Sequence, residues 1–327
     1  MKVFLILPVL LAMLAESVPA QNGRLYVNDM KAPENRQDLE AIQDALAKAL
    51  PQARAATVAI EIKDGSGSGV IISEDGLVLT AAHVSAAVKK KVTVILEDGT
   101  RLKAETLGLV ADKDAAMLRI TEPGKYPFVE LDREATTRLG DWVFSLGHSG
   151  GFDKERGSVV RLGRLVRTAS STFQSDCMLI GGDSGGPLFD LAGKLVGIHS
   201  RVGQQLQVNM HVPMTEFIGN WDAMLAGDFI GEGPFAQQAV KGTGFLGLAT
   251  EGVAAGGLRV TKVGIGSPAE KAGIEDGDIL LKLNEIQLES RVQMQDLLKE
   301  MAAGDELTLE TNRAGEAKTF TLELSAR

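Results

Sequence analysis

One serine in this sequence stands in a setting that keeps bulky side chains away from its hydroxyl group. Ser184 lies in LIGGDSGGPLFD, the stretch from Leu179 to Asp190, with a glycine pair on each side of the Asp-Ser dipeptide. Glycine pairs also occur in ordinary turns. However, they let the backbone approach a ligand closely, and their N–H groups can converge on a developing negative charge. The stretch therefore favours a nucleophilic serine over a simple turn.

A nucleophilic serine needs a general base, and four histidines are available. His83 lies in LTAAHVSAA, where a strand-like run ends in small residues. His148 is a loop residue, His199 follows a strand and could line a cleft, and the setting of His211 in VNMHVPM is typical of a packed core or edge residue. His83 has the most telling setting for a base, although each histidine taken by itself is more simply a structural residue.

The base in turn needs an acid that fixes its tautomer and stabilises its charged form. The stretch ADKDAAMLRI offers Asp112 and Asp114. Asp114 directly precedes the apolar run, so its carboxylate could be carried inward at the entrance of a strand, whereas Asp112 is typical of a solvated turn. Asp114 is the predicted acid.

Composition and charge narrow the class of protein. A chain of 327 residues predicts two or three domains. Its hydrophobic content of 44% and charged content of 24% are ordinary for soluble globular proteins. The net charge of -9 argues against a nucleic-acid binder. No HExxH or paired-cysteine spacing occurs, so we expect no metal site. The single cysteine, Cys177, is most simply a small buried apolar residue.

The N-terminus has the layout of an export signal. Residues 1–20, MKVFLILPVLLAMLAESVPA, combine a lysine, an apolar run and a small-residue end. This pattern predicts a secretory signal cleaved after Ala20 and hence a periplasmic or secreted protein. An uncleaved membrane anchor is the alternative.

The elements that must position these residues are mostly short strands. In an N-terminal helical segment, 21–55, a helix is predicted over 36–50 because Leu39, Ile42, Leu46 and Leu50 share one stripe. From 56 to 226, short strands alternate with glycine turns such as Asp75-Gly76, which predicts a β-barrel or sandwich.

The end of the chain reads as a separate unit. A helix near 214–225 is expected to close the strand-rich region, and the glycine-rich stretch 227–242 is interpreted as a linker. Residues 243–327 contain five strand-like runs and two helical ones, which predicts a small α+β domain with its own core.

The chain order TAAHV, DKDAAMLRI, GGDSGGPL resembles the chymotrypsin-like serine peptidases, and in particular the HtrA/Deg group of exported peptidases with PDZ domains. GSGSGVIISEDGLVLTAAHV, RLGDWVFSLGHSGG and SVVRLGRL add to the resemblance, which covers roughly residues 56–325. It implies a mainly β protein, with two six-stranded barrels and the site in the cleft between them. His83 then matches the base, Asp114 the acid and Ser184 the nucleophile. The N–H groups of Gly182 and Ser184 match the oxyanion hole.

The resemblance also assigns the primary specificity pocket and exposes two departures. Met178 matches the base of the pocket, with Leu179 and Ile180 close by, which implies a preference for aliphatic side chains before the cut. Asp183 stands where HtrA-like sites usually have asparagine. In digestive-type relatives an aspartate there pairs with an N-terminus made by cleavage, but no such activation sequence is present, so its partner is open. The stretch EIKDGSGSG also leaves little room for a long regulatory loop.

The C-terminal unit resembles a PDZ domain through GFLGL and SPAEKAGIEDGDILLKLNE. The resemblance implies that the amides of Leu246, Gly247 and Leu248 cradle a peptide's terminal carboxylate, with the peptide lying against the helix containing 292–298.

The function expected from these assignments is an exported serine endopeptidase that cuts unfolded or exposed protein segments without any metal or organic cofactor. Its partners would be unfolded or misfolded proteins and, at the PDZ domain, peptide C-termini. The resemblance also makes a homo-oligomer, a trimer or larger, an expectation. The alternative is a peptide-binding or chaperone-like protein whose protease fold has lost activity.

Overall fold

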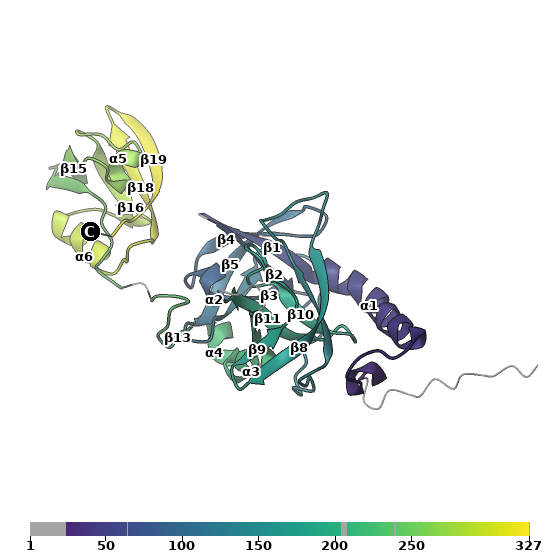
Figure 1. The fold of residues 1–327 in the computed structure, drawn as a ribbon. Coiled ribbons are helices and arrows are strands. Elements are labelled where there is room, and N and C mark those ends of the chain that lie inside the picture. Colours follow the sequence, from purple (N-terminus) through teal and green to yellow (C-terminus); the bar gives the residue numbers. More distant parts are fainter. Residues whose placement is uncertain (1–23, 64, 204–207, 239, 255, 327) are drawn as a thin grey trace, which may run out of the picture. The chain divides into compact units, whose positions relative to one another are not determined.

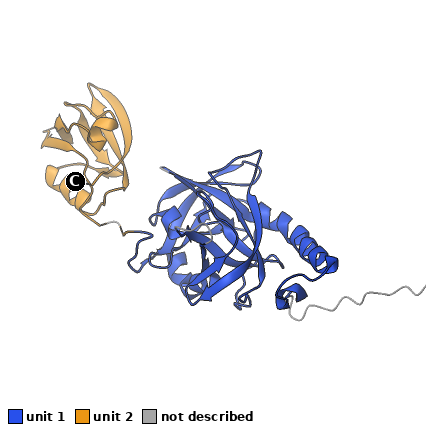
Figure 2. Ribbon diagram, in the orientation of Figure 1, with its two compact units in different colours: residues 1–236 blue, residues 237–327 orange. Residues whose placement is uncertain are grey.

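The computed structural model describes residues 24–63, 65–203, 208–238, 240–254 and 256–326. The predicted signal segment, residues 1–20, lies outside this part of the chain. Two compact units follow one another, one ending at Ala236 and the other beginning at Gln237 (Figure 2). Within the described residues, no helix has both the length and the apolar character that crossing a membrane requires.

The N-terminal segment of the first unit forms a short 3-10 helix, Tyr26–Asp29, and the long helix α1, Arg36–Ala56. Asn35 caps α1 in a reciprocal capping box with Asp38. The helix begins where the sequence predicted but continues past Leu50 to Ala56, because its last turn packs Ala53 and Ala56 into the core. Of the predicted stripe, Ile42 is buried, whereas Leu39 is 59% exposed.

The first β-barrel closes in the strand order β5-β4-β1-β2-β3-β6, because β5 also pairs with β6 (Figure 1). The short helix α2, Ala82–Ser85, follows β3. Gly76, with φ at +86°, turns the chain between β2 and β3, as its Asp-Gly sequence predicted. The strands are β1 Thr57–Ile62, β2 Gly65–Ile71, β3 Leu77–Thr80, β4 Lys91–Ile95, β5 Arg101–Val110 and β6 Ala115–Ile120.

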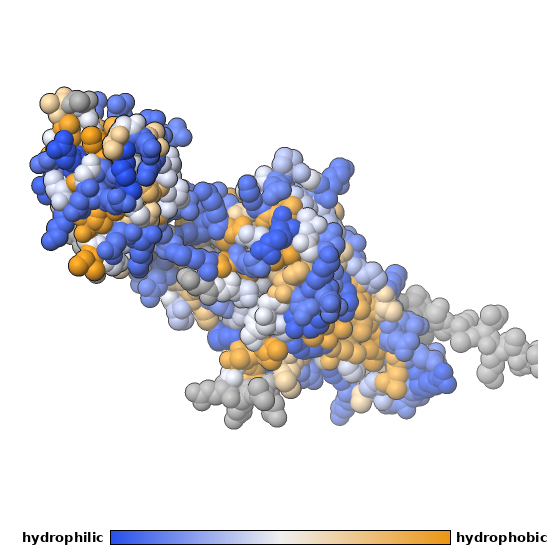
Figure 3. Space-filling view, turned by 90° about the horizontal axis from the view of Figure 1, so that it is seen from above, coloured by the Kyte–Doolittle hydropathy of each residue, from blue (hydrophilic) through white to orange (hydrophobic). Residues whose placement is uncertain are grey.

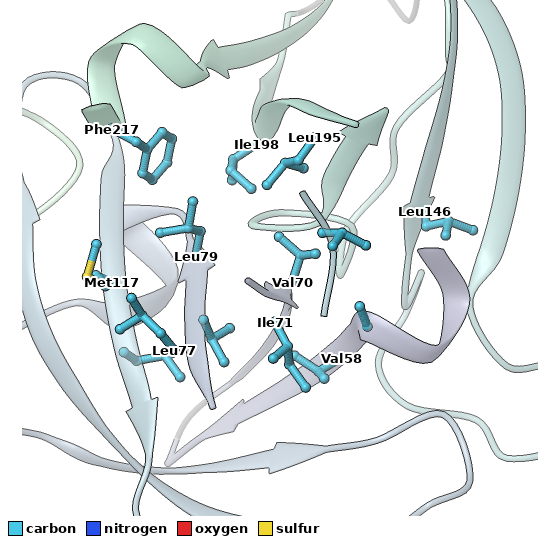
Figure 4. Close-up of a cluster of buried hydrophobic side chains, with 14 of the residues drawn as sticks. Val58, Val70, Ile71, Leu77, Leu79, Met117, Leu146, Leu195, Ile198 and Phe217 are labelled. Atoms are coloured by element: carbon cyan, nitrogen blue, oxygen red, sulfur yellow. The ribbon is translucent and has the colours of Figure 1, made fainter. Parts of the chain in front are cut away.

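The second barrel closes in the order β10-β11-β12-β9-β8-β7. Its strands are β7 Trp142–Gly147, β8 Val159–Ala169, β9 Thr172–Ser175, β10 Pro187–Asp190, β11 Leu195–Val202 and β12 Asn209–Pro213. One continuous core joins the two barrels, with Leu79 and Met117 from the first and Leu146 and Ile198 from the second (Figure 4). The predicted mainly β, chymotrypsin-like class with two six-stranded barrels is confirmed.

The end of the first unit differs from the expected helix and linker. Two short helices, α3 Met214–Gly219 and α4 Trp221–Ala226, replace the single helix expected over 214–225. Within the stretch interpreted as a linker, β13, Phe229–Ile230, pairs in parallel with β5, and Ala236 is buried. Glycine-rich composition favoured a linker, but backbone pairing holds the first half of this stretch on the barrel.

The second unit is a small α+β domain with its own core, as predicted. Its sheet has the order β14-β15-β16-β18-β19, and β17 pairs with β16. Leu258, Leu280 and Leu309 lie at the centre of the core. The elements are β14 Leu248–Gly252, β15 Leu258–Val263, α5 Pro268–Lys271, β16 Ile279–Leu283, β17 Ile286–Gln287, α6 Arg291–Lys299, β18 Glu306–Arg313 and β19 Glu316–Glu323.

Candidate active site

His83 sits on α2, where the chain leaves β3, and its side chain is 35% exposed. The buried neighbours Ala82 and Val84 anchor the helical turn that carries it. The ring Nδ1 lies 2.9 Å from each carboxylate oxygen of Asp114, and the backbone N–H of His83 donates to Oδ1 at 3.0 Å. The carboxylate therefore fixes both the position of the ring and the tautomer with the proton on Nδ1.

Asp114 lies in the turn between β5 and β6 and is fully buried. Its backbone φ of +60° is in the left-handed region, which aspartate tolerates better than most residues. The Ser200 hydroxyl, on β11, donates to its Oδ2 at 2.5 Å. The alternative acid, Asp112, is 44% exposed beside Lys113. The structure thus brings His83, Asp114 and Ser200 together, and sequence reasoning had missed Ser200.

Ser184 follows a tight turn made by residues 180–183. The N–H of Asp183 donates to the carbonyl oxygen of Ile180 at 3.1 Å, and φ of Gly182 is +94°. A positive φ at the third residue is the pattern of a type II turn, which favours glycine there. A Cβ on Gly182 would lie 2.5 Å from the carbonyl oxygen of His148. Glycine at 182 is therefore required by both conformation and space.

Contacts with the first barrel fix the backbone around the serine. The carbonyl oxygen of Ser184 accepts from the N–H of Ser68 at 2.7 Å, and that of Gly182 accepts from the Ser68 hydroxyl at 2.8 Å. A Cβ on Gly67 would lie 2.7 Å from Val84 and 3.0 Å from the Ser184 oxygen, so the helix that carries His83 closely approaches the serine backbone. Within the described residues, the N–H groups of Gly182 and Ser184 have no protein acceptor.

The remaining histidines are buried and neutral. His199 and His211 face each other with Nδ1 atoms 2.9 Å apart, and the Ser175 hydroxyl lies 2.7 Å from Nε2 of His211. Burial lowers the pKa of His199 to about 3 and that of His148 to about 4. His199 lies inside the second barrel rather than lining a cleft, and His211 is a packed residue as predicted.

An aromatic side chain from the end of the first unit lies beside the histidine. The ring centroid of Phe235 is 6.5 Å from that of His83, and the Arg201 guanidinium lies 5.1 Å from the centre of the Phe235 ring. A cavity of about 110 Å³ next to them is lined by residues that include Asp112, Lys113 and Ser200. Sequence reasoning missed Phe235 because its segment was interpreted as a linker.

The residues predicted for the specificity pocket differ in exposure. Met178 is 51% exposed and Ile180 is 50% exposed, while Leu179 is buried and its N–H donates to Asn209 Oδ1 at 2.8 Å. Cys177 is buried, and burial raises the pKa of its thiol to about 11. The cysteine is thus an inert apolar residue, as predicted.

The second unit has a groove between β14 and α6. Its cavity of about 240 Å³ is lined by apolar side chains that include Phe245, Leu246, Met294 and Leu298. Gly247 has φ at +84°, and a Cβ there would lie 2.1 Å from the Ser267 side chain. Within the described residues, the N–H groups of Leu246 and Gly247 have no protein acceptor.

Comparison with known proteins agrees with this architecture. Residues 67–198 match the model of the trypsin-like peptidase domain, and residues 244–324 match that of the PDZ domain. Proteins named "Probable periplasmic serine endoprotease DegP-like" are similar to the chain. The one from Rhizobium meliloti is 29% identical over 269 residues, 79% of this chain and 53% of its own length. The one from Pseudomonas fluorescens is 30% identical over 269 residues, 80% of this chain and 56% of its own length.

The chain spans about half the length of the curated relatives it matches. The two domain matches follow each other in the order that the fold shows, and they include the stretches that carry His83, Asp114 and Ser184. The chain therefore combines a trypsin-like peptidase domain with a PDZ domain and is similar to DegP-like serine endoproteases.

Proposed function

We propose that the first unit is a serine endopeptidase with Ser184 as nucleophile, His83 as base and Asp114 as orienting acid. The observation that carries the proposal is the fixed tautomer of His83. Because Nδ1 faces the buried carboxylate at 2.9 Å, the other ring nitrogen, Nε2, is left to accept a proton. The neighbouring turn supplies two open backbone donors at Gly182 and Ser184.

The reaction follows from these positions. His83 removes the Ser184 proton as Oγ attacks a peptide carbonyl, and the developing oxyanion accepts hydrogen bonds from the Gly182 and Ser184 amides. One such donor typically contributes about 3 kcal/mol of transition-state stabilisation. His83 then gives the proton to the leaving amine, and water hydrolyses the acyl-enzyme by the reverse sequence. The chain's own residues account for each proton transfer.

In the second unit, the amides of Leu246, Gly247 and Leu248 hold the carboxylate of a peptide C-terminus. The peptide extends the sheet beside β14, and its last side chain enters the apolar cavity against α6. Val292 is 65% exposed and does not line this cavity.

The substrate residue just before the cleaved bond carries an aliphatic side chain. Met178, Leu179 and Ile180 have no negative charge that could pair with a lysine or arginine. Mass spectrometry of cut sites tests this assignment. Cleavage mainly after lysine or arginine would contradict it.

The protein acts outside the cytoplasm on unfolded or misfolded proteins. Support comes from the signal-like residues 1–20 and from the periplasmic location in the relatives' names. We also propose a homo-oligomer, a trimer or larger. Apolar side chains on the surface of the first unit (Figure 3) provide contact area for it. The exposed apolar residues of this unit include Leu39, Leu139, Leu162 and Val166.

The decisive experiment compares wild type with Ser184→Ala on a chemically unfolded protein. We expect fragments from wild type only, while Ser66→Ala, which removes an exposed hydroxyl on β2, cuts as wild type does. Equal suppression of aggregation by wild type and Ser184→Ala, without fragments from either, would instead identify an inactive chaperone-like protein.

A further inference from the structure

The carboxylate of Asp183, the residue before the nucleophile, is an integral part of the turn that aims the oxyanion donors. Its side chain is only 1% exposed. It accepts from the N–H of Ile180 at 2.9 Å and from the Ser149 hydroxyl at 2.6 Å. The first bond joins the first and last residues of the 180–183 turn. The second connects the turn to the loop after β7.

A cation from the second barrel completes this arrangement. Nη2 of Arg161, on β8, lies 3.1 Å from Oδ2 of Asp183 and donates to the Ser149 hydroxyl at 2.9 Å. The Arg161 side chain is 18% exposed, and its backbone pairs with Ser145 on β7. Within the described residues, no other lysine or arginine forms an ion pair with Asp183. The charge that balances this buried carboxylate therefore comes from a rigid strand.

We infer that Arg161 is a positioning residue for the peptidase reaction: through Asp183 it holds the 180–183 turn in the conformation that presents the Gly182 and Ser184 amides. This inference rests on the proposed function. Digestive-type relatives are expected to use an N-terminus made by cleavage at this place. Here the cation is part of the folded barrel, so the turn needs no cleavage to acquire its counter-ion.

The physical reason is the cost of an unpaired buried charge. If Arg161 is removed, the Asp183 carboxylate loses its counter-ion. The Ser149 hydroxyl also loses the guanidinium group that donates to it. The carboxylate then gains by moving toward water, and the Ile180 bond that shapes the turn is lost with that movement. Of the proposed pocket residues only Ile180 belongs to this turn, so substrate binding depends on the bond much less than oxyanion stabilisation does.

The experiment uses the full chain, a short aliphatic peptide substrate and a peptide aldehyde that forms a tetrahedral adduct with the serine. Arg161→Met should lower kcat on the order of 100-fold, the lower end of the effect of losing one oxyanion donor. It should weaken aldehyde binding by a similar factor and leave KM within about threefold, because only transition-state interactions are lost. Arg161→Lys keeps the charge but has one nitrogen in place of the guanidinium fork. Its kcat should lie between those of Arg161→Met and wild type.

Arg164→Met is the matched control. Arg164 lies on the same strand, but its guanidinium stacks on Trp142 and donates to the carbonyl oxygens of Met30 and Lys31, away from the turn. Its kcat should stay near wild type. The double variant Arg161→Met with Asp183→Asn removes both charges and should recover most of the lost kcat, since the asparagine oxygen can still accept from Ile180.

Thermal unfolding of each variant separates misfolding from misplacement of the turn. If Arg161→Met does not fold, the folded double variant and Arg161→Lys carry the test. A kcat for Arg161→Met equal to that of Arg164→Met, or a double variant no better than the single one, would overturn the inference. If wild type cuts no better than Ser184→Ala, the proposed function fails instead.

Discussion

Replacing Gly182 by alanine should remove most of the activity while leaving the barrels folded. With φ at +94°, alanine would stand in a backbone region that costs a residue with a Cβ about 1–2 kcal/mol. The new Cβ would also lie 2.5 Å from the His148 carbonyl oxygen and 2.6 Å from the Gly150 nitrogen, both of which are backbone atoms that cannot rotate away. The turn must therefore move.

The size of the effect follows from what the movement displaces. The amide of residue 182 is one of the two open donors, and losing one oxyanion donor costs about 3–4 kcal/mol, or roughly a hundred- to a thousandfold in kcat. Gly181 provides a matched control, because a Cβ there would meet no atom within 4 Å. We expect Gly181→Ala to keep kcat within about threefold.

The assay is the rate of cleavage of a short peptide by active protein, quantified by titration of the serine with a fluorophosphonate. Unfolding in urea reports stability separately. A Gly182→Ala protein that is folded and as active as Gly181→Ala would refute the assignment of the 182 amide to the oxyanion hole.

Three further predictions concern the acid, pH and the end of the barrel unit. Ser200→Ala removes the 2.5 Å bond to Asp114 and should lower kcat roughly 10- to 100-fold in peptide assays with little change in KM. Because His148 titrates in the unfolded chain near 6.5 but in the fold only near 4, the unfolded state binds more protons in between. His148 alone should lower stability by about 2–3 kcal/mol as pH drops from 7 to 4.5, and His148→Asn should reduce the total loss by that amount in urea titrations. A chain ending at Gln237 should cut short peptides at the full rate, whereas one ending at Gly231 should be slower, because it lacks the aromatic ring beside the histidine.

The fold class was accessible from sequence because its signals are local. Short apolar runs and Asp-Gly turns predicted the strands, and the glycine pairs around Ser184 indicated a candidate nucleophile. His83 and Asp114, which their local setting favoured and the family resemblance assigned, are in direct contact.

The contacts that sequence reasoning missed all join segments that are far apart in the chain. Ser200 meets an aspartate 86 positions away, and Arg161 on β8 meets Asp183 in the turn before β10. A serine or an arginine in a strand has no neighbourhood that reveals such a partner. Phe235 was missed for another reason. The glycine-rich composition of its segment indicated a linker, whereas the two-residue strand β13 holds the segment on the barrel.

The left-handed backbone at Asp114 limits which residues could ever replace it. Glycine, asparagine and aspartate adopt this conformation at the lowest cost, and of these only aspartate carries a charge. Glutamate would keep the charge but would strain the turn and overfill a fully buried space. Any substitution at position 114 therefore strains the turn or removes the charge. A descendant of this chain that lost catalysis but kept its barrels would be expected to carry asparagine or glycine here, which makes residue 114 a marker for distinguishing active from inactive copies of this protein.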